Sequence, residues 1–200
     1  HEGIAWCLIQ QDAEIPVLGT KIFTKDGNYK LVFPNGKFAS FFTYPELRYL
    51  EWKGLGKILQ VYQAYEVERS TYAFKNFVEC YFKKKQTDLK GHEFWKLFLN
   101  SLYGKFAQEA DSPEMILDPN GKLAESESFI KKRRLVHTNI MIAAYITARA
   151  RLYMHGFYEK TGIKNLIYTD TDSIHTLRPF SVRSNGLGSL SFKGKTDSSR

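Results

Sequence analysis

The sequence predicts an α+β fold, in which a strand-rich N-terminal part is followed by helices and by a β-hairpin. Short β-like runs separated by Gly, Pro and Asp lie at residues 4–9, 21–24 and 29–33. Segments that read as helices follow at 72–85, 93–107 and 138–160. Residues 165–177 read as strand, tight turn, strand. Strands and helices in separate stretches of one chain are typical of an α+β protein.

In the N-terminal part, the run from Tyr29 to Phe38 is predicted to be a hairpin around Asn35-Gly36, because Asn-Gly favours two-residue turns. Pro45 to Gly54 is predicted to be a short helix. Asn-Gly recurs at 120–121. We interpret the two pairs as turns of the same chemistry and not as a sequence repeat.

The segment 72–85 has apolar residues at helical spacing. They are Phe74, Phe77, Val78, Tyr81 and Phe82. It ends in three lysines at 83–85, which usually form a solvated helix end favoured by the macrodipole. A short loop joins it to the next predicted helix, so two antiparallel helices with lysines on both would form a basic cleft.

The helix predicted at 93–107 places Lys96, Asn100 and Tyr103 on one face, at i, i+4 and i+7. A cation, an amide and a ring offer contacts to a phosphate, a polar group and a flat sugar or base. Leu97, Leu99 and Leu102 are left for packing. For Lys96 alone, an ordinary lysine at the edge of an amphipathic helix is the better interpretation.

Residues 108–135 are polar and are predicted to be a hairpin insertion that ends in the basic run 131–134. Such a run is more often a solvated surface than a specific binding site. The long helix 138–160 is predicted to have Thr138 as its N-cap and Gly162 just past its end. Thr147 and Arg151 are i, i+4 neighbours on it and share a face. The simpler alternative for Arg151 is a solvated side chain on a surface helix.

Asp170 and Asp172 lie at the predicted turn between the runs 165–167 and 174–177. Residues two apart on an extended chain point to the same side, so both carboxylates can approach one cation. Hard oxygen ligands suit Mg²⁺, and a carboxylate pair is what two-metal phosphoryl or nucleotidyl transfer requires. Most Asp-x-Asp pairs, however, are solvated turn residues.

The chain of 200 residues has 29 Lys and Arg against 21 Asp and Glu, a net charge of +8. This balance favours a polyanionic partner, and interleaved aromatic and basic residues suit nucleic acid. Cys7 and Cys80 match no metal spacing and are expected to be two buried free thiols. No apolar run is long enough to span a membrane, so no membrane partner is expected.

Two strings resemble signatures of one enzyme family. The run Tyr168-Thr169-Asp170-Thr171-Asp172-Ser173 resembles the catalytic Tyr-x-Asp-Thr-Asp-Ser motif of family B DNA polymerases. The pattern Lys-x-x-x-Asn-Ser-x-Tyr-Gly at 96–104 is similar to the nucleotide-binding motif of the same enzymes. The segment 146–152 resembles the protein-primed branch found in phages, adenoviruses and linear plasmids.

The resemblance implies a role for each candidate residue. Asp170 and Asp172 would be catalytic and hold two Mg²⁺ ions. Lys96 and Lys84, with Lys83 and Lys85 as alternatives to the latter, would contact the triphosphate. Asn100 and Tyr103 would contact the incoming nucleotide, and Thr147 and Arg151 the primer strand. The implied partners are primer–template DNA, dNTPs and a terminal priming protein.

The resemblance also implies an organisation. It predicts a β-rich insertion before the fingers at 1–70, the two fingers helices at 71–107, a hairpin insertion at 108–135, and a palm at 136–200. The palm is expected to be an antiparallel sheet backed by helices. The chain is expected to be a fragment, inactive alone, because a further metal-binding Asp of the family would precede residue 1, with the exonuclease carboxylates and a later Lys-x-Tyr element also outside it.

The predicted function is therefore template-directed nucleotidyl transfer in DNA replication. The main alternative is a non-catalytic nucleic-acid-binding remnant, which would explain the charge but would not require the five motif residues together. An RNA-templated polymerase is disfavoured because adjacent Asp-Asp is usual there, and not Asp-Thr-Asp-Ser.

Overall fold

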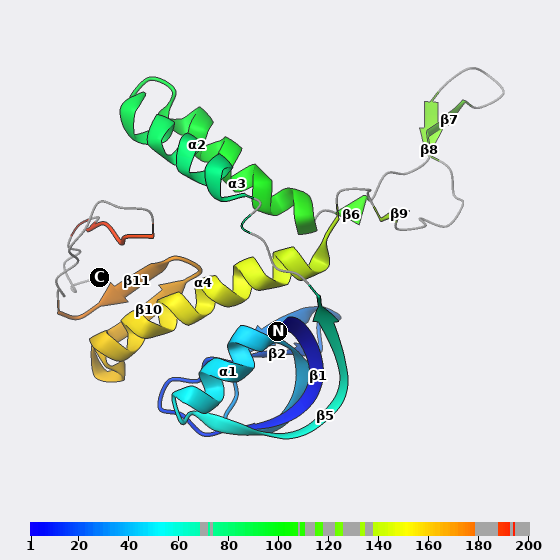
Figure 1. Ribbon diagram of the computed structural model, residues 1–200, viewed down its shortest axis with the longest axis vertical. Helices are drawn as coiled ribbons and strands as arrows, with labels where there is room; N and C mark the ends of the chain where they lie inside the picture. The colour runs from blue at the N-terminus through cyan, green and yellow to red at the C-terminus, as the bar shows by residue number, and fades with distance from the viewer. Residues whose placement is uncertain are drawn as a thin grey trace. The chain divides into compact units, whose positions relative to one another are not determined.

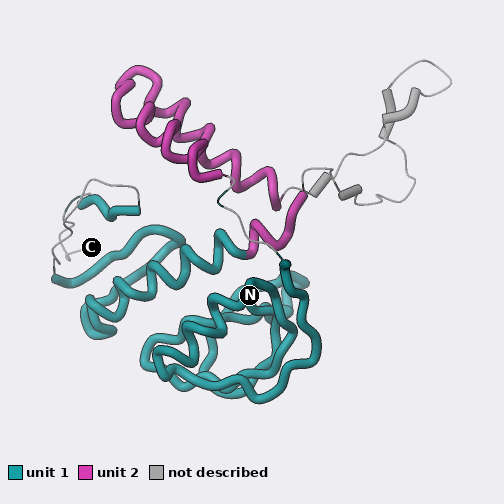
Figure 2. Tube along the Cα trace, viewed as in Figure 1, with its two compact units in different colours: residues 1–72, 145–200 teal, residues 73–144 magenta. Residues whose placement is uncertain are grey.

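The computed structural model describes residues 1–68, 72, 74–107, 109–110, 115–117, 123–125, 133–134, 138–178, 188–192 and 194. The chain divides into two compact units, shown in Figure 2. Unit 1 consists of residues 1–72 and 145–200, and unit 2 of residues 73–144. Antiparallel strand pairs and helices together form the α+β fold that the sequence predicts.

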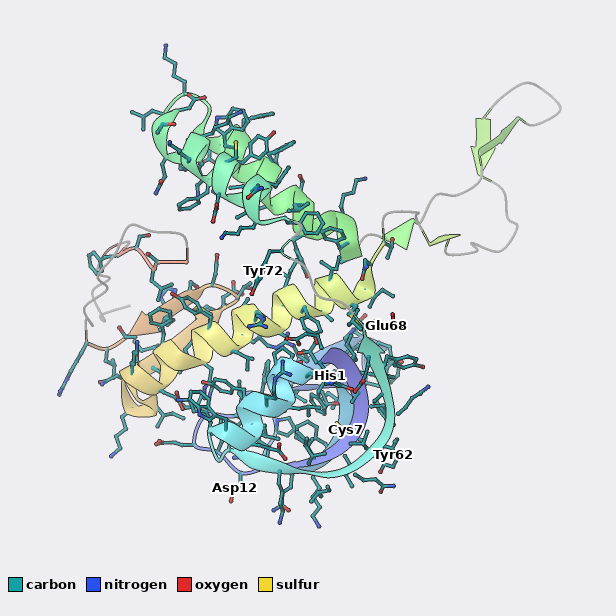
Figure 3. The ribbon with its side chains drawn as sticks, viewed as in Figure 1. His1, Cys7, Asp12, Tyr62, Glu68 and Tyr72 are labelled. Carbon is teal, nitrogen blue, oxygen red and sulfur yellow. The ribbon has the colours of Figure 1, made fainter. Side chains whose placement is uncertain are left out.

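Unit 1 contains an antiparallel sheet of three strands in the order β4-β1-β5, in which β1 is Glu2–Gln11, β4 is Gly36–Thr43 and β5 is Gly56–Val67 (Figure 1). Alternate residues of β1 are fully buried, so one face of the sheet packs on the core. The core cluster consists of Ala5, Cys7, Ile9, Val17, Leu18, Phe42, Leu47 and Leu50. In Figure 3, Cys7 lies inside the curve of the strands, whereas Tyr62 lies outside it.

The hairpin predicted around Asn35-Gly36 is wrong. β3 (Tyr29–Val32) pairs instead with β2 (Thr20–Phe23), through a turn that contains Gly27 at φ 78°. β4 starts at Gly36 and pairs with β1. The Asn35 amide is held by the backbone of Ala13, which donates to Oδ1 at 3.1 Å and accepts from Nδ2 at 2.9 Å. These contacts turn the chain toward β1 and not back onto β3.

The predicted short helix is confirmed as α1 (Tyr44–Trp52). A capping box starts it, in which the Thr43 backbone N–H donates to Glu46 Oε2 at 2.9 Å. Leu47 and Leu50 on its buried side pack into the core. The chain leaves the helix through Gly54, which has φ 66°.

The predicted long helix is confirmed as α4 (Ile140–Thr161). Its cap is Asn139 and not Thr138, because Asn139 Oδ1 accepts the Ile142 backbone N–H at 3.1 Å. Gly162, at φ 74°, ends it as predicted. In unit 1, α4 packs against α1 through the buried His155, whose Nδ1 lies 3.0 Å from the hydroxyl of Tyr49.

A 3₁₀ turn, η1 (Ile163–Asn165), leads from α4 into β10 (Leu166–Asp170) and β11 (Ser173–Thr176), which pair antiparallel. The Leu177 backbone N–H donates to the carbonyl of Asn165 at 2.9 Å and closes the base of this hairpin. The strand–turn–strand prediction for 165–177 is confirmed.

Unit 2 contains two antiparallel helices, α2 (Lys75–Thr87) and α3 (His92–Ala107). Rings of the two helices pack along their length, with centroids 5.1 Å apart for Phe74 and Phe106 and 5.6 Å for Tyr81 and Trp95. The expectation that Leu97 packs is wrong, since it is 69% exposed. The half-buried side of α3 carries Trp95, Phe98, Leu99, Leu102 and Phe106.

Within the predicted hairpin insertion, β6 (Glu109–Ala110) pairs with β9 (Arg133–Arg134) and β7 (Met115–Leu117) pairs with β8 (Leu123–Glu125), both antiparallel. The predicted turn at 120–121 and the lysines at 131–132 lie outside the described residues.

Both cysteines are free thiols as expected, but only Cys7 is buried. Cys80, on α2, is exposed. Of the helices in the described ranges, none is both long and apolar enough to cross a membrane.

Candidate active site

The Asp-Thr-Asp string lies at the tip of the β10–β11 hairpin. Asp170 is the last residue of β10 and pairs with Ser173, so Thr171 and Asp172 form a two-residue turn. Thr171 has φ 42° and is the one non-glycine residue with a positive φ in the described part of the chain. A β-branched residue there is a true outlier, and such strain gathers at functional sites.

Both carboxylates are exposed at this turn. The Thr171 hydroxyl donates to Asp170 Oδ1 at 3.1 Å. Among the described residues, no Lys, Arg or His forms an ion pair with Asp170 or Asp172. Asp172 belongs to the turn and not to an extended strand, so the turn, rather than strand periodicity, determines where its carboxylate points.

The donor set fits a divalent cation. Carboxylate oxygens that no described basic side chain neutralises are hard ligands of the kind Mg²⁺ prefers, with nucleotide phosphates and water as the usual further ligands. In the described ranges, no group of three or more His, Cys, Asp or Glu side chains could hold a metal ion. The hairpin therefore offers two carboxylates and not a complete set of protein ligands for a metal ion.

The candidate primer contacts lie on α4. Thr147 is half-buried, and Arg151 forms a 2.6 Å ion pair with Glu46, whose side chain is 5% exposed. Glu46 is thereby bound both to Arg151 and to the N-terminus of its own helix α1. One Nη group of Arg151 binds this carboxylate, while a guanidinium has five N–H donors in all.

The candidate nucleotide contacts lie in unit 2. Lys84 Nζ stands 5.0 Å from the Tyr81 ring centroid and 4.9 Å from that of Trp95, so a cation–π pair holds it on the ring row. Lys96 Nζ lies 3.3 Å from a carboxylate oxygen of Glu93, in an exposed pair that costs little to exchange for a phosphate. Asn100 and Tyr103 are exposed on the same helix.

The loop between α2 and α3 is fixed by Asp88. Its carboxylate accepts the Trp95 indole N–H at 3.0 Å and the Gly91 backbone N–H at 2.9 Å. The hydrogen bond from Trp95, followed by that from Gly91, lowers the pKa of Asp88. This arrangement fixes the Trp95 ring against which Lys84 lies.

The candidate residues are divided between the two compact units. Asp170, Asp172, Thr147 and Arg151 belong to unit 1, and Lys84, Lys96, Asn100 and Tyr103 to unit 2. Sequence reasoning missed Glu46 as the partner of Arg151. Its signal was present, because Thr43-x-x-Glu46 before an apolar helix is a capping box.

Tyr145 was also missed. Its hydroxyl, which has one proton to donate, lies 3.0 Å from Glu2 Oε2 and 2.8 Å from the Gly3 carbonyl oxygen, and this links α4 to β1. Burial, together with the bonded Glu2 carboxylate, raises the pKa of Tyr145 to about 12. No local sequence pattern predicts such a contact.

Comparison with known proteins shows the family of this chain. Residues 5–179 match the family described as DNA polymerase type B, organellar and viral, and the chain belongs to that family. A related protein, described as a probable DNA polymerase of Ascobolus immersus, is 25% identical over 187 residues. The match covers 82% of this chain and 15% of the relative.

The fold is similar to that of phi29 DNA polymerase. Its complex with primer-template DNA and incoming nucleotide substrates gives a TM-score of 0.57 at 26% identity, over 88% of this chain and 32% of that one. The orthorhombic crystal form gives a TM-score of 0.59 at 22% identity, over 90% of this chain and 32% of that one. The chain therefore spans about a third of the solved polymerase and less of the Ascobolus relative.

Proposed function

We propose that this chain forms the fingers and most of the palm of a protein-primed DNA polymerase that performs template-directed nucleotidyl transfer. The observation that carries the proposal is the strained Asp170-Thr171-Asp172 turn, which presents two carboxylates with no described basic partner in a chain of family B. The domain roles predicted for 1–70, 71–107, 108–135 and 136–200 are part of the same proposal.

In this reaction a primer 3′-hydroxyl forms a bond to the α-phosphorus of a dNTP, the bond to pyrophosphate breaks, and the hydroxyl proton is lost. Positioning and charge neutralisation dominate such chemistry. Asp170 and Asp172 would hold Mg²⁺, which when bound neutralises phosphate charge and lowers the pKa of the hydroxyl.

The remaining residues bind and orient the reactants. Lys96 and Lys84 contact the triphosphate, the first after leaving Glu93 and the second from its place on the Tyr81 and Trp95 rings. Asn100 and Tyr103 contact the nucleotide. Thr147 and the remaining donors of Arg151 contact the primer strand, while Glu46 keeps the Arg151 side chain in position.

The test is primer extension by the complete reading frame that encodes this chain, carrying Asp172→Ala or Asp170→Ala. Loss of a metal-holding carboxylate removes several kcal/mol of transition-state stabilisation, so extension should fall by about a thousandfold or more. Binding of primer–template DNA should stay nearly unchanged.

The matched control is Asp26→Ala, which removes an exposed turn carboxylate from the β2–β3 connection. Normal extension by either hairpin variant would exclude the proposed site. Wild-type protein that binds DNA but never extends a primer in Mg²⁺ would instead favour the non-catalytic alternative.

A further inference from the structure

Unit 1 contains an open cleft of about 720 Å³ between α1 and α4. It is lined by two guanidinium groups, of Arg48 and Arg149, and by the rings of Tyr49, Trp52 and Tyr153. Its size lies within the range of ligand-binding clefts. None of these five residues belongs to the nucleotide-binding or metal-holding sets above.

The two arginines give the cleft a positive charge. Arg48 lies 3.0 Å from a Glu2 carboxylate oxygen and Arg149 lies 3.8 Å from the other, so one carboxylate serves two cations. No acidic residue lines the cleft itself. The side chains of Arg48 and Arg149 are 54% and 64% exposed. Arg48 Nη1 also donates to the His1 carbonyl at 2.9 Å, and the N–H donors that these contacts leave over are available to an anion.

Two of the three rings in the cleft are exposed as well. Trp52 is 77% exposed and Tyr153 is 53% exposed, an unusual state for large rings on packed helices. Tyr49 meets Trp52 edge to face at 6.0 Å, which fixes the orientation of the two rings. Lys53 Nζ stands 5.3 Å from the Trp52 ring centroid, but its charge is paired with Glu159 at 2.7 Å, so the charge of the cleft comes from the two arginines.

We propose that this cleft binds single-stranded DNA, with phosphates on Arg48 and Arg149 and an unpaired base stacked on Trp52. Arginine binds phosphate oxygens in a planar fork, and rings beside cations form the stacking surface that single strands use. A duplex keeps its bases stacked inside and would leave the rings without a role. The inference rests on the proposed function in that DNA is its ligand.

An acidic peptide is the competing ligand. Its carboxylates would satisfy the two arginines but would not require Trp52, whereas every unpaired base has a flat face that can stack on this ring. The neighbouring Arg151 differs from Arg149, because the buried Glu46 holds it at 2.6 Å. The geometry therefore assigns strand binding at this cleft to Arg149 and Arg48.

The experiment measures anisotropy of a labelled oligothymidylate titrated with the 200-residue chain over a range of salt. Arg48→Gln with Arg149→Gln should lower affinity at least about tenfold and flatten the log K against log salt slope by about 1.4, since each single-strand phosphate contact contributes about 0.7. Trp52→Ala should weaken binding by about tenfold with the salt slope unchanged, because stacking is not an ionic contact.

The matched controls lie on the β2–β3 hairpin of the same unit. Lys21→Gln with Lys30→Gln removes two exposed charges, and Tyr29→Ala removes a ring that is 72% exposed. Both should bind like the unchanged chain. Circular dichroism checks that each variant is folded. If the double variant is unfolded, Arg149→Gln alone replaces it in the binding measurement.

Equal losses in the control variants would overturn the inference, and so would stronger competition by an acidic peptide than by unlabelled oligothymidylate. The two proposals fail separately. If the cleft variants bind normally while Asp172→Ala still abolishes extension, the cleft is wrong and the function stands. If the cleft variants lose binding while the complete protein never extends a primer, the function is wrong and the cleft stands.

Discussion

The two compact units are stabilised in different ways. Unit 1 encloses a core whose members include Cys7, Ile9 and Phe42, each no more than 2% exposed. Neither α2 nor α3 of unit 2 contains a buried residue, and a row of half-buried rings holds these helices together instead. Few buried contacts mean low local stability. We expect α2 and α3 to open before unit 1 unfolds.

The largest expected effect is on the core of unit 1. Phe42→Ala removes a ring that is 2% exposed and should lower the free energy of unfolding by about 3–5 kcal/mol. Phe41→Ala is the matched control, because its ring is 57% exposed on the other face of β4. Urea unfolding followed by circular dichroism measures both, and equal losses would show that unit 1 has no tight core.

The second effect is a pH dependence confined to unit 1. Burial raises the pKa of the Cys7 thiol from 9.0 to about 11. The unfolded chain therefore ionises first, so this stability is fully present below pH 9 and is lost as the pH rises through 11. The free energy of unfolding should fall by about 2 kcal/mol between pH 8 and about 10.5.

Cys7→Ala should remove most of this slope, while Cys80→Ala, at an exposed thiol, should leave it in place. A residual fall above pH 10 belongs to the other groups of unit 1 whose pKa is raised, which are Tyr145, with a pKa of about 12, Tyr44, Tyr49 and Lys53. An unchanged slope in Cys7→Ala would show that the thiol is not the titrating group.

A smaller effect is expected in unit 2. Phe98→Ala removes contacts to Phe77 at 5.5 Å and Tyr81 at 4.7 Å, and should cost about 1–2 kcal/mol because the ring is only half-buried. Hydrogen exchange should speed up across α2 and α3 and stay constant in β1. Phe94→Ala, at a ring that is 58% exposed, should change less. Faster exchange in β1 as well would mean that the units unfold together.

The smallest effect concerns the contact of Lys96 in unit 2 with the dNTP. In the complete reading frame, Lys96→Ala should raise the KM for dNTPs or lower kcat, with a loss of about tenfold in kcat/KM, since one exposed charge-assisted contact to phosphate is removed. Lys75→Ala, at a second exposed lysine of the same unit paired with Glu79, should not change either constant. Unchanged kinetics for Lys96→Ala would show that Lys96 is an ordinary solvated lysine and does not contact the triphosphate.

The sequence by itself determined the helices and the β10–β11 hairpin. Helical spacing is a local property, so α2, α3 and α4 appear within a few residues of their predicted bounds. The tight turn at Asp170 to Ser173 is equally local. The same strings carry the family resemblance, which the match over residues 5–179 confirms. The individual roles of Lys84, Lys96 and Arg151 stay predictions.

Only the tertiary structure decided which distant segments meet. Asn35 binds Ala13, 22 residues away, and this contact overrides the turn preference of Asn-Gly. Glu46 binds Arg151 across 105 residues, and Arg48 and Arg149 line one cleft although they lie on different helices. Strand partners, ion pairs and clefts join residues far apart in sequence. Their energies depend on burial and geometry that arise when the chain folds, so no local pattern specifies them.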